Sequence, residues 1–241
     1  MLINVDRYNS LDKVYLPNWR WNIFLDYTIN SLSIFELEKL SIPKEFLHKE
    51  ISYGLKDKSS LVKTVTWGCK IPKFKKIRAA CVDGESLASV LNLVFIPSEN
   101  FDLPFFGADF VTLPNGHLIA LDLQPALKND SEHTEIVWKR LIPLYQKWQK
   151  KLPQGGPIPD DAKPYFSPGF LWTRIPLGKK GDQIISDVIY QAFTEYLSLF
   201  LELLSDASEV SKERSLLVVN AQRSYFQYRA QKDPARGMLN R

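Results

Sequence analysis

The sequence predicts an α/β fold, a three-layer α/β/α sandwich built around a central, mostly antiparallel β-sheet. Five apolar runs follow one another between residues 61 and 124, with only short turns between them. Strands joined by short turns pair antiparallel. Patterns typical of amphipathic helices precede and follow these runs. A sheet of this kind buries at least one face, and helices usually cover it.

The first sixty residues are expected to hold an arm, one helix and a loop. Residues 1–18 are expected to form an extended arm. From Trp19 to Leu40 the apolar residues fall near helical spacing, and Pro43 marks the end of this helix. Residues 49–60 are polar, which favours a loop.

The five strands are expected over residues 61–69, 74–83, 87–96, 105–113 and 116–124. Turn residues separate them, among them Asp83-Gly84 and Asn115-Gly116. An Asn-Gly pair suits the type I′ turn of a tight hairpin. The last two strands are therefore expected to be neighbours in the sheet.

The second half of the chain is expected to be largely helical. Residues 132–150 have helical spacing, with a kink or a break at Pro143. Residues 152–180 are rich in Pro and Gly and indicate a long loop around a short apolar segment, 169–174. Helices follow over about 182–205 and 207–230. Because no linker or repeat divides the chain, a single domain is expected over residues 1–241.

Composition and motifs exclude several classes of protein. The net charge of +4 is too small to indicate nucleic-acid binding. No apolar run reaches the ~18 residues of a membrane span, and the N-terminus lacks a secretory signal. Cys69 and Cys81 form no CxxC motif, the three histidines are scattered, and no nucleotide-binding motif occurs. The chain is therefore expected to bind no metal or cofactor of its own.

Asp109 is a carboxylate inside an apolar run that is typical of a buried strand. Complete burial raises the pKa of a carboxyl group by ~3–5 units. Asp109 is therefore either a structural residue with a buried partner or an acid that donates a proton at neutral pH. Gly107, on the same face, is expected to leave room for a flat molecule. Asp122 poses the same question on the next strand, and we interpret it as the structural one.

Asp233 and the basic residues are the remaining candidates. Asp233 precedes a proline, so a rigid turn places its side chain; such turns are also common on ordinary surfaces. Basic residues cluster over 70–78, over 147–151 and at Lys179 and Lys180. These clusters are either solvated surface or a docking site for an acidic partner.

Three segments together resemble the ferredoxin-dependent bilin reductases. They are residues 102–109 (DLPFFGAD), 121–125 (LDLQP) and 233–237 (DPARG), and the resemblance extends over about 60–240. Within the family, the phycoerythrobilin-forming branch is the most similar. The resemblance implies an α/β/α sandwich that holds an open-chain tetrapyrrole between the sheet and the C-terminal helices. It also implies that no metal or flavin is bound and that reduced ferredoxin delivers electrons singly.

The resemblance also implies roles for single residues. The two proton donors of the family fall on Asp109, from the sheet, and on Asp233, from the helix side. Arg174 stands where the family has an arginine near the bilin propionates, and Arg236 is expected to steer Asp233 or a propionate. Asn92 and its neighbour Ala80 stand where the phycocyanobilin-forming branch has a His and a Glu. Asn92 is instead similar to the branches that make phycoerythrobilin or its precursor.

The expected reaction is the two-electron reduction of 15,16-dihydrobiliverdin at the A-ring diene to phycoerythrobilin. Two alternatives stay open: a reductase that forms 15,16-dihydrobiliverdin from biliverdin, and a bilin carrier without chemistry. The expected partners are ferredoxin, a linear tetrapyrrole and the preceding bilin reductase, with no nucleic acid and no membrane. A monomer is expected, in the cytoplasm of a cyanobacterium or in the plastid stroma of an alga.

Overall fold

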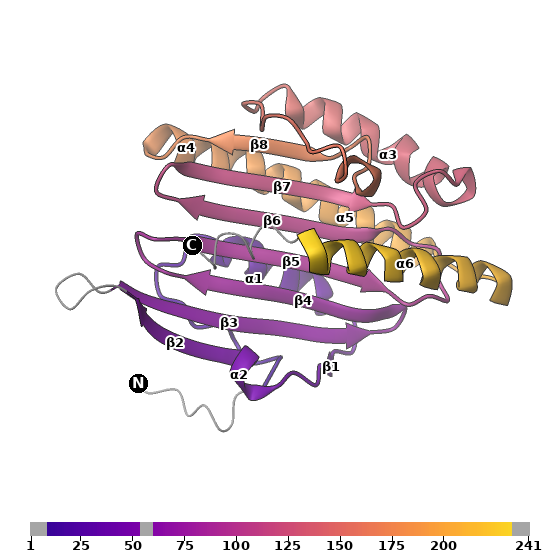
Figure 1. Ribbon diagram of the computed structural model, residues 1–241, viewed down its shortest axis with the longest axis horizontal. Helices are drawn as coiled ribbons and strands as arrows, with labels where there is room; N and C mark the ends of the chain where they lie inside the picture. The colour runs from indigo at the N-terminus through magenta and orange to yellow at the C-terminus, as the bar shows by residue number, and fades with distance from the viewer. Residues whose placement is uncertain (1–8, 54–59, 233–241) are drawn as a thin grey trace.

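The computed structural model describes residues 9–53 and 60–232. In this part of the chain, eight strands form one sheet in the order β1-β3-β4-β5-β6-β7-β8, with β2 also paired to β3 (Figure 1). Each neighbouring pair is antiparallel. The strands are β1 (Glu38–Lys39), β2 (His48–Tyr53), β3 (Ser60–Ile71), β4 (Phe74–Asp83), β5 (Ser89–Pro97), β6 (Phe105–Leu113), β7 (Gly116–Gln124) and β8 (Leu171–Ile175).

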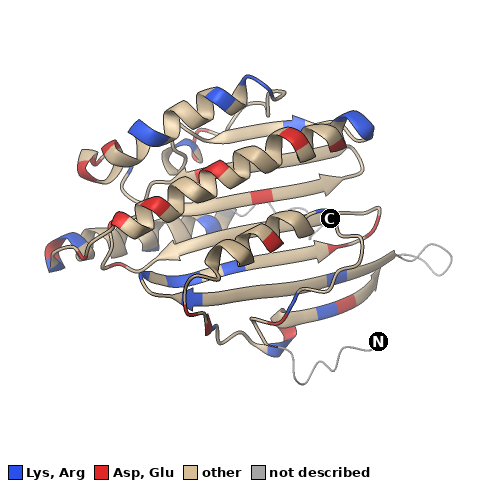
Figure 2. Ribbon diagram, turned by 180° about the vertical axis from the view of Figure 1, so that it is seen from behind, with Lys and Arg blue, Asp and Glu red and all other residues tan. Residues whose placement is uncertain are grey.

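Helices lie on both sides of the sheet. One side carries α1 (Asn22–Leu32) and α5 (Tyr190–Asp206), and α3 (Ser131–Gln149) packs beside α5 and β8 (Figures 1 and 2). The other side is crossed by α6 (Lys212–Lys232). The short helical segments are α2 (Lys44–Leu47), η2 (Lys163–Tyr165), α4 (Lys179–Ile184) and η3 (Ile185–Ile189). The predicted three-layer α/β/α sandwich is therefore confirmed.

The main hydrophobic core lies between the sheet and the α1/α5 layer. Side chains alternate along a strand, so β6 buries Phe106, Ala108 and Phe110 on this side. Phe193 of α5 packs against both phenylalanines, with ring centroids 5.9 Å from Phe106 and 5.7 Å from Phe110. The opposite face of β6 is left with Phe105, Gly107 and Asp109. Stability is thus concentrated on one face of the sheet.

Among the described residues, the α6 face carries one small apolar cluster. Ile96, Phe105 and Tyr225 are its buried members, and the rings of Phe105 and Tyr225 stack with centroids 4.6 Å apart. The cluster fixes α6 near the end of β5 and the start of β6. Farther along the same strands, Asn92 and Asp109 are only half-buried. A large part of this face therefore stays accessible to a ligand.

The five predicted strands all exist, and β4, β6 and β7 have the predicted bounds. The predicted loop over 49–60 is wrong in its first part, because residues 48–53 form β2. β2 lies at the sheet edge and almost all of its residues are exposed. An exposed edge strand buries no apolar face, so its sequence lacks the alternation that reveals a strand. The predicted helix from Trp19 to Leu40 is shorter, and ends at Leu32.

Two further predictions in the second half need correction. The apolar segment in the predicted loop over 152–180 is a strand, β8, which pairs with β7. Pro143 does not break its helix, since α3 continues through it to Gln149. Pro143 and Lys139, whose carbonyl loses its usual hydrogen-bond partner, are both exposed, so water can satisfy that carbonyl. In the described residues, no helix has the length and apolar character needed to cross a bilayer.

Candidate active site

A continuous row of residues crosses the sheet on the α6 face. From β3 to β8 its members are Thr66, Ala80, Asn92, Asp109, Ala120 and Trp172, and each residue is the direct cross-strand partner of the next. All of them are half-buried. We call them the cross-strand row. It forms an open floor, which a flat, extended molecule would cover.

Asp109 and Asn92 lie side by side in the middle of this row. The structure places Asp109 at intermediate burial, so the expectation of complete burial is wrong for this residue. Its face of β6 lacks the helix layer that buries Ala108 and Phe110. Asn92 accepts a hydrogen bond at Oδ1 from Nη2 of Arg78 on β4, at 2.6 Å. A carboxyl and an amide therefore stand together on a surface that a ligand can reach.

Gly107 does not leave empty space, contrary to our expectation. A Cβ atom at this position would lie 3.2 Å from Oε1 of Gln124, which reaches across from β7. The same Oε1 accepts a hydrogen bond from the Tyr225 hydroxyl of α6, at 2.6 Å. The missing side chain at Gly107 thus makes room for the contact between β7 and α6.

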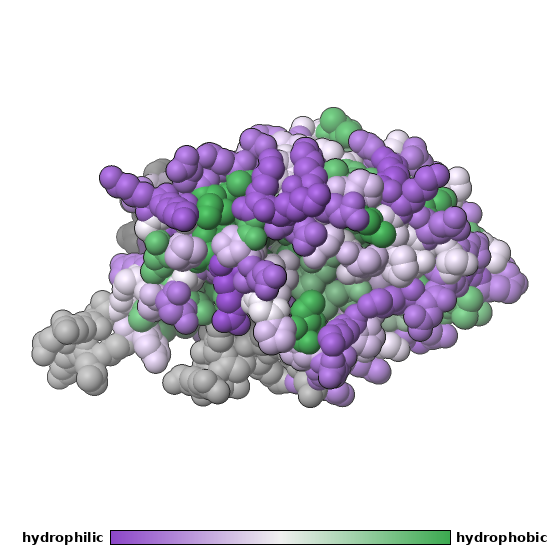
Figure 3. Space-filling view, turned by 90° about the horizontal axis from the view of Figure 1, so that it is seen from above, coloured by the Kyte–Doolittle hydropathy of each residue, from purple (hydrophilic) through white to green (hydrophobic). Residues whose placement is uncertain are grey.

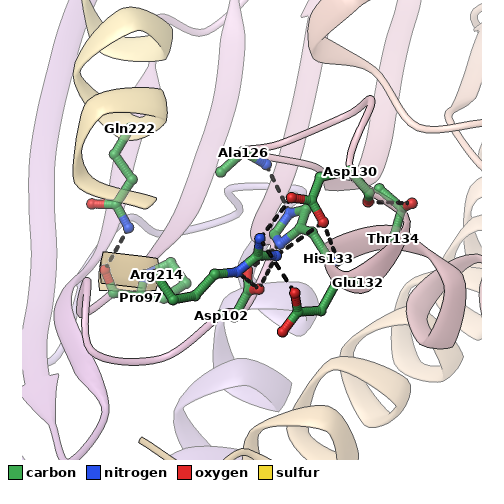
Figure 4. A network of polar contacts seen from close by, with 9 residues as sticks. All are labelled: Pro97, Asp102, Ala126, Asp130, Glu132, His133, Thr134, Arg214 and Gln222. Carbon is green, nitrogen blue, oxygen red and sulfur yellow. Dashed lines mark hydrogen bonds and ion pairs between the residues drawn. The ribbon is translucent and has the colours of Figure 1, made fainter. Parts of the chain in front are cut away.

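A partly buried ion-pair network fixes the start of α6 (Figure 4). Arg214 donates to Asp130, from Nη1 at 2.6 Å, and to Asp102, from Nε at 2.6 Å. His133 also contacts Asp102 through Nδ1, while its Nε2 accepts from the Ala126 backbone N–H at 3.0 Å. A ring nitrogen that accepts is unprotonated, so the proton of a neutral His133 sits on Nδ1 and faces Asp102.

This network also sets the charge state of its carboxylates. Burial by itself raises the pKa of Asp102, but hydrogen bonds from His133 and Arg214 hold that pKa below its usual range. The Arg214 hydrogen bonds, helped by the His133 backbone N–H, lower the pKa of Asp130 to about 2. Both carboxylates are therefore ionised at neutral pH, and the sheet, α3 and α6 are joined at one point.

Asp122 differs from Asp109 in its surroundings. It is 1% exposed and accepts hydrogen bonds from the backbone N–H of Ser167, at 2.9 Å, and from the Ser167 hydroxyl. Burial raises the pKa of Asp122 to about 7, although both Ser167 bonds act to lower it. These contacts make Asp122 the anchor of the chain segment that leads into β8.

Arg174 lies at the β8 end of the same face and is exposed. Its guanidinium carbon is 5.9 Å from the ring centroid of Trp172. A cavity of about 260 Å³ opens beside Trp172, with Tyr145 and Phe170 in its lining. Seen from the side that carries β8 and α3, hydrophobic residues are exposed among hydrophilic ones (Figure 3). Arg174 therefore stands at the margin of the row and not in its middle.

Asp233 and Arg236 lie outside the described residues. α6 ends at Lys232, over the same face as the row, and Asp233 is the next residue of the chain (Figure 1). On the last turns of α6, Arg229 donates from Nη1 to the Tyr225 hydroxyl at 3.4 Å. Of the five predicted site residues, the structure thus brings Asn92, Asp109 and Arg174 to one face.

The basic clusters are partly engaged within the protein. The Lys73 ammonium group donates to the carbonyls of Leu204 and Ala207, at 2.9 and 2.7 Å, at the end of α5. Lys75 pairs with Glu99 at 2.8 Å, and Lys147 pairs with Glu195 at 2.5 Å. On the α1/α5 side, α1 and α5 carry acidic residues only, and α3 carries both basic and acidic residues (Figure 2). Lys73 is thus a helix cap, and not part of a docking surface.

Sequence reasoning missed the roles of four residues that only their partners reveal. Gln124, Tyr225 and Arg214 make contacts between α6 and the rest of the protein, and Arg78 contacts Asn92. Asp102 was visible as the first residue of the segment 102–109, and the spacing from Asp130 to His133 is that of a helix start.

Comparison with known proteins identifies the family. A family model described as ferredoxin-dependent bilin reductase matches residues 26–241. The chain belongs to the ferredoxin-dependent bilin reductases. This bilin reductase is 56% identical over 236 residues to a phycoerythrobilin:ferredoxin oxidoreductase from Prochlorococcus marinus (strain MIT 9211), covering 98% of the chain and 92% of the relative. A relative of the same name from Synechococcus sp. (strain RCC307) is 55% identical over 235 residues, with 98% and 90% covered.

The fold of this bilin reductase is shared with a solved structure of the family. Phytochromobilin synthase from tomato, crystallised in complex with biliverdin, matches with a TM-score of 0.76 and 26% identity. The match covers 91% of this chain and 75% of that protein. The chain is therefore an oxidoreductase that reduces a bilin with electrons from ferredoxin.

Proposed function

We propose that this bilin reductase converts 15,16-dihydrobiliverdin to phycoerythrobilin by a two-electron reduction of the A-ring diene. The observation that carries the proposal is the similarity to phycoerythrobilin:ferredoxin oxidoreductases over 98% of the chain. The cross-strand row supports it, because the conjugated rings of an open-chain tetrapyrrole offer a broad face that can lie over such a row. We propose further that one domain carries the activity and that the chain binds no cofactor of its own.

Asp109 is the proposed proton donor on the sheet side. A conjugated bilin that has gained one electron is more basic than before, so a neighbouring carboxylic acid can protonate it. Two electrons from ferredoxin and two protons from the protein complete the reduction. Asp109 stands in the middle of the accessible row, where such a transfer needs it. Asp233, which follows α6 directly, is the proposed donor from the opposite side.

The proposed contacts with the bilin propionates use Arg174 and Arg236. Guanidinium and carboxylate groups match in a bidentate pair, and Arg174 is exposed at the end of the row. Asn92 is the proposed amide contact next to Asp109. Partners of the protein are then reduced ferredoxin, the tetrapyrrole and the preceding bilin reductase. The proposed compartment is the cytoplasm of a cyanobacterium, with the plastid stroma of an alga as the alternative, and the cyanobacterial source of the named relatives favours the first.

The deciding experiment supplies biliverdin or 15,16-dihydrobiliverdin to the purified protein with reduced ferredoxin. The absorption spectrum of the product is then compared with authentic phycoerythrobilin. Phycoerythrobilin formed only from dihydrobiliverdin supports the proposal. Conversion of biliverdin to 15,16-dihydrobiliverdin would instead assign the earlier step. A bound pigment whose spectrum does not change on adding reduced ferredoxin would indicate a carrier.

A further inference from the structure

Arg78 contacts Asn92 diagonally across two neighbouring strands. Nη2 of Arg78 lies 2.6 Å from Oδ1 of Asn92. Asn92 is paired with Ala80, two residues beyond Arg78 on β4, so both side chains project from the same face of the sheet. Arg78 is half-buried, like the members of the cross-strand row. A permanent positive charge thus stands directly beside the row.

The contact fixes which way the Asn92 amide points. A guanidinium group has only N–H donors, so the atom that faces it must be the amide oxygen. The amide NH₂ then points away from Arg78. Without this contact, the terminal torsion of asparagine is broad and roughly two-fold, and the oxygen and the nitrogen can exchange places. Arg78 therefore selects one of the two amide orientations that the backbone position of Asn92 allows.

The consequence falls on the space in front of Asp109. Asn92 and Asp109 are direct cross-strand partners, and the Cβ atoms of such pairs are roughly 5 Å apart. The two N–H donors of the amide are thus within reach of an acceptor that lies over this pair. If the amide were reversed, its oxygen would face that acceptor and repel it.

We propose that Arg78 is a positioning residue, which acts through Asn92 to hold an amide donor toward the bound tetrapyrrole. This inference rests on the proposed binding of the pigment over the row. The acceptor is a lactam carbonyl oxygen of a terminal pyrrole ring, which becomes more electron-rich when the pigment takes up an electron. A donor already fixed in place stabilises that charge at no cost of reorientation.

The test is a double-mutant cycle on β4 and β5. Arg78→Met and Asn92→Ala should each lower kcat about 10- to 100-fold, the range of a hydrogen bond to a charged group. The double variant should be no slower than the slower single variant, because both substitutions remove the same oriented amide donor. Arg223→Met is the control, since it removes an exposed positive charge from α6, on the same side of the sheet, at a residue outside the basic clusters. It should leave kcat within about twofold.

A conservative variant and the pigment spectrum show whether Arg78 positions Asn92 or only supports the folded structure. Arg78→Lys keeps a donor at the end of a long side chain and should recover part of the lost rate. The absorption band of the bound pigment should shift equally in Arg78→Met and Asn92→Ala, and this reading requires no turnover. Losses that multiply in the double variant, or a band that moves in only one single variant, would overturn the inference. If the wild-type protein reduces only biliverdin, the same cycle run with biliverdin tests Arg78 independently of the proposed step.

Discussion

Asp109 and Asp122 lie on neighbouring strands, but their surroundings give them different chemistry. Asp122 is enclosed, and Ser167 hydrogen-bonds both of its oxygens. Asp109 is half-buried on the open face, beside Asn92. A proton donor must reach the reacting molecule, and of these two carboxyl groups only Asp109 is placed to do so. Accessibility, and not burial, is the property that distinguishes the candidate catalytic acid.

Asp109→Asn is expected to lower turnover at least 100-fold while the pigment still binds. The amide has the size of the carboxyl group but no acidic proton, and acid catalysis typically contributes about 10²- to 10⁴-fold. The measurement is the rate of colour change with reduced ferredoxin, together with the spectrum of the bound pigment. Asp187→Asn, an exposed residue in the α1/α5 layer, serves as the control. Wild-type turnover in Asp109→Asn would exclude Asp109 as the donor.

Asp122 is expected to make the stability of the protein fall as pH rises from about 4 to 7. Its pKa is raised to about 7 in the folded state, so the folded protein binds this proton more tightly than the unfolded chain. The resulting slope is about 1.4 kcal/mol per pH unit in this window. Urea unfolding at several pH values measures it.

Asp122→Asn should remove this part of the pH dependence, because an amide does not titrate. Ser167→Ala should extend the window to higher pH, because it deletes a hydrogen bond that favours the charged form. Equal slopes in the wild-type protein and in Asp122→Asn would contradict the assignment.

At the scale of elements, α6 is held to the sheet by a few side-chain contacts and by one small apolar cluster. Arg214 fixes its start, Gln222 donates to the carbonyl of Pro97 at 3.1 Å, and Tyr225 contacts Gln124. An element attached in this way can cover a ligand without filling the face itself. The network in Figure 4 therefore fixes the position of the first turn of α6.

Arg214→Met is expected to weaken pigment binding more than any other single change on α6. It leaves the carboxylates of Asp102 and Asp130 without their cation. Breaking a fully buried ion pair costs about 3–5 kcal/mol, and the partial exposure of Asp130 makes the expected cost smaller. Titration of the pigment, followed by absorbance, measures the affinity, and hydrogen exchange measures the protection of α6. Arg223→Met is the matched control, because Arg223 lies exposed on the same helix. Equal affinities for the two variants would show that the network does not position α6.

The strands that could be predicted from the sequence have a local signal, either alternating burial or a turn motif, and the strands that were missed have none. β6 and β7 alternate between a buried face and an open face and are joined by Asn115-Gly116, so both local signals agree. β2 and β8 are edge strands, recognisable only from their pairing with β3 and β7. The site follows the same rule. Asp109 was found as a carboxylate inside an apolar run, and Asn92 and Arg174 were found through family patterns. The Arg78–Asn92 contact depends on strand register and on side-chain reach, which one sequence does not reveal.

For the molecule as a whole, one face of the sheet carries the main hydrophobic core and the other carries the candidate active site. The main core fills one face, with Phe193 at its centre against Phe106 and Phe110. The other face carries the row, the small α6 cluster and the candidate acid. Changes on the two faces should therefore have separable effects.

Phe193→Ala is expected to lower the free energy of unfolding by about 3–5 kcal/mol, since it leaves a cavity in the core. At a temperature where the variant is still folded, its affinity for the pigment should stay near that of the wild-type protein. Asn92→Ala should show the reverse, with little change in stability and a clear change in the pigment spectrum. Urea unfolding and pigment titration on both variants test whether stability and pigment binding depend on different faces of the sheet. A loss of pigment binding in folded Phe193→Ala would disprove this.

The strict register of the cross-strand row has a consequence for how selectivity can evolve. Adjacent strands lie roughly 4.8 Å apart, so six strands divide a distance of roughly 24 Å into equal steps. Moving an acidic residue from one strand to its cross-strand partner shifts the acid by one such step relative to the bound pigment, with no change in the backbone. The strand that carries the acid would then decide which carbon atom of the pigment is protonated, and hence which double bond is reduced.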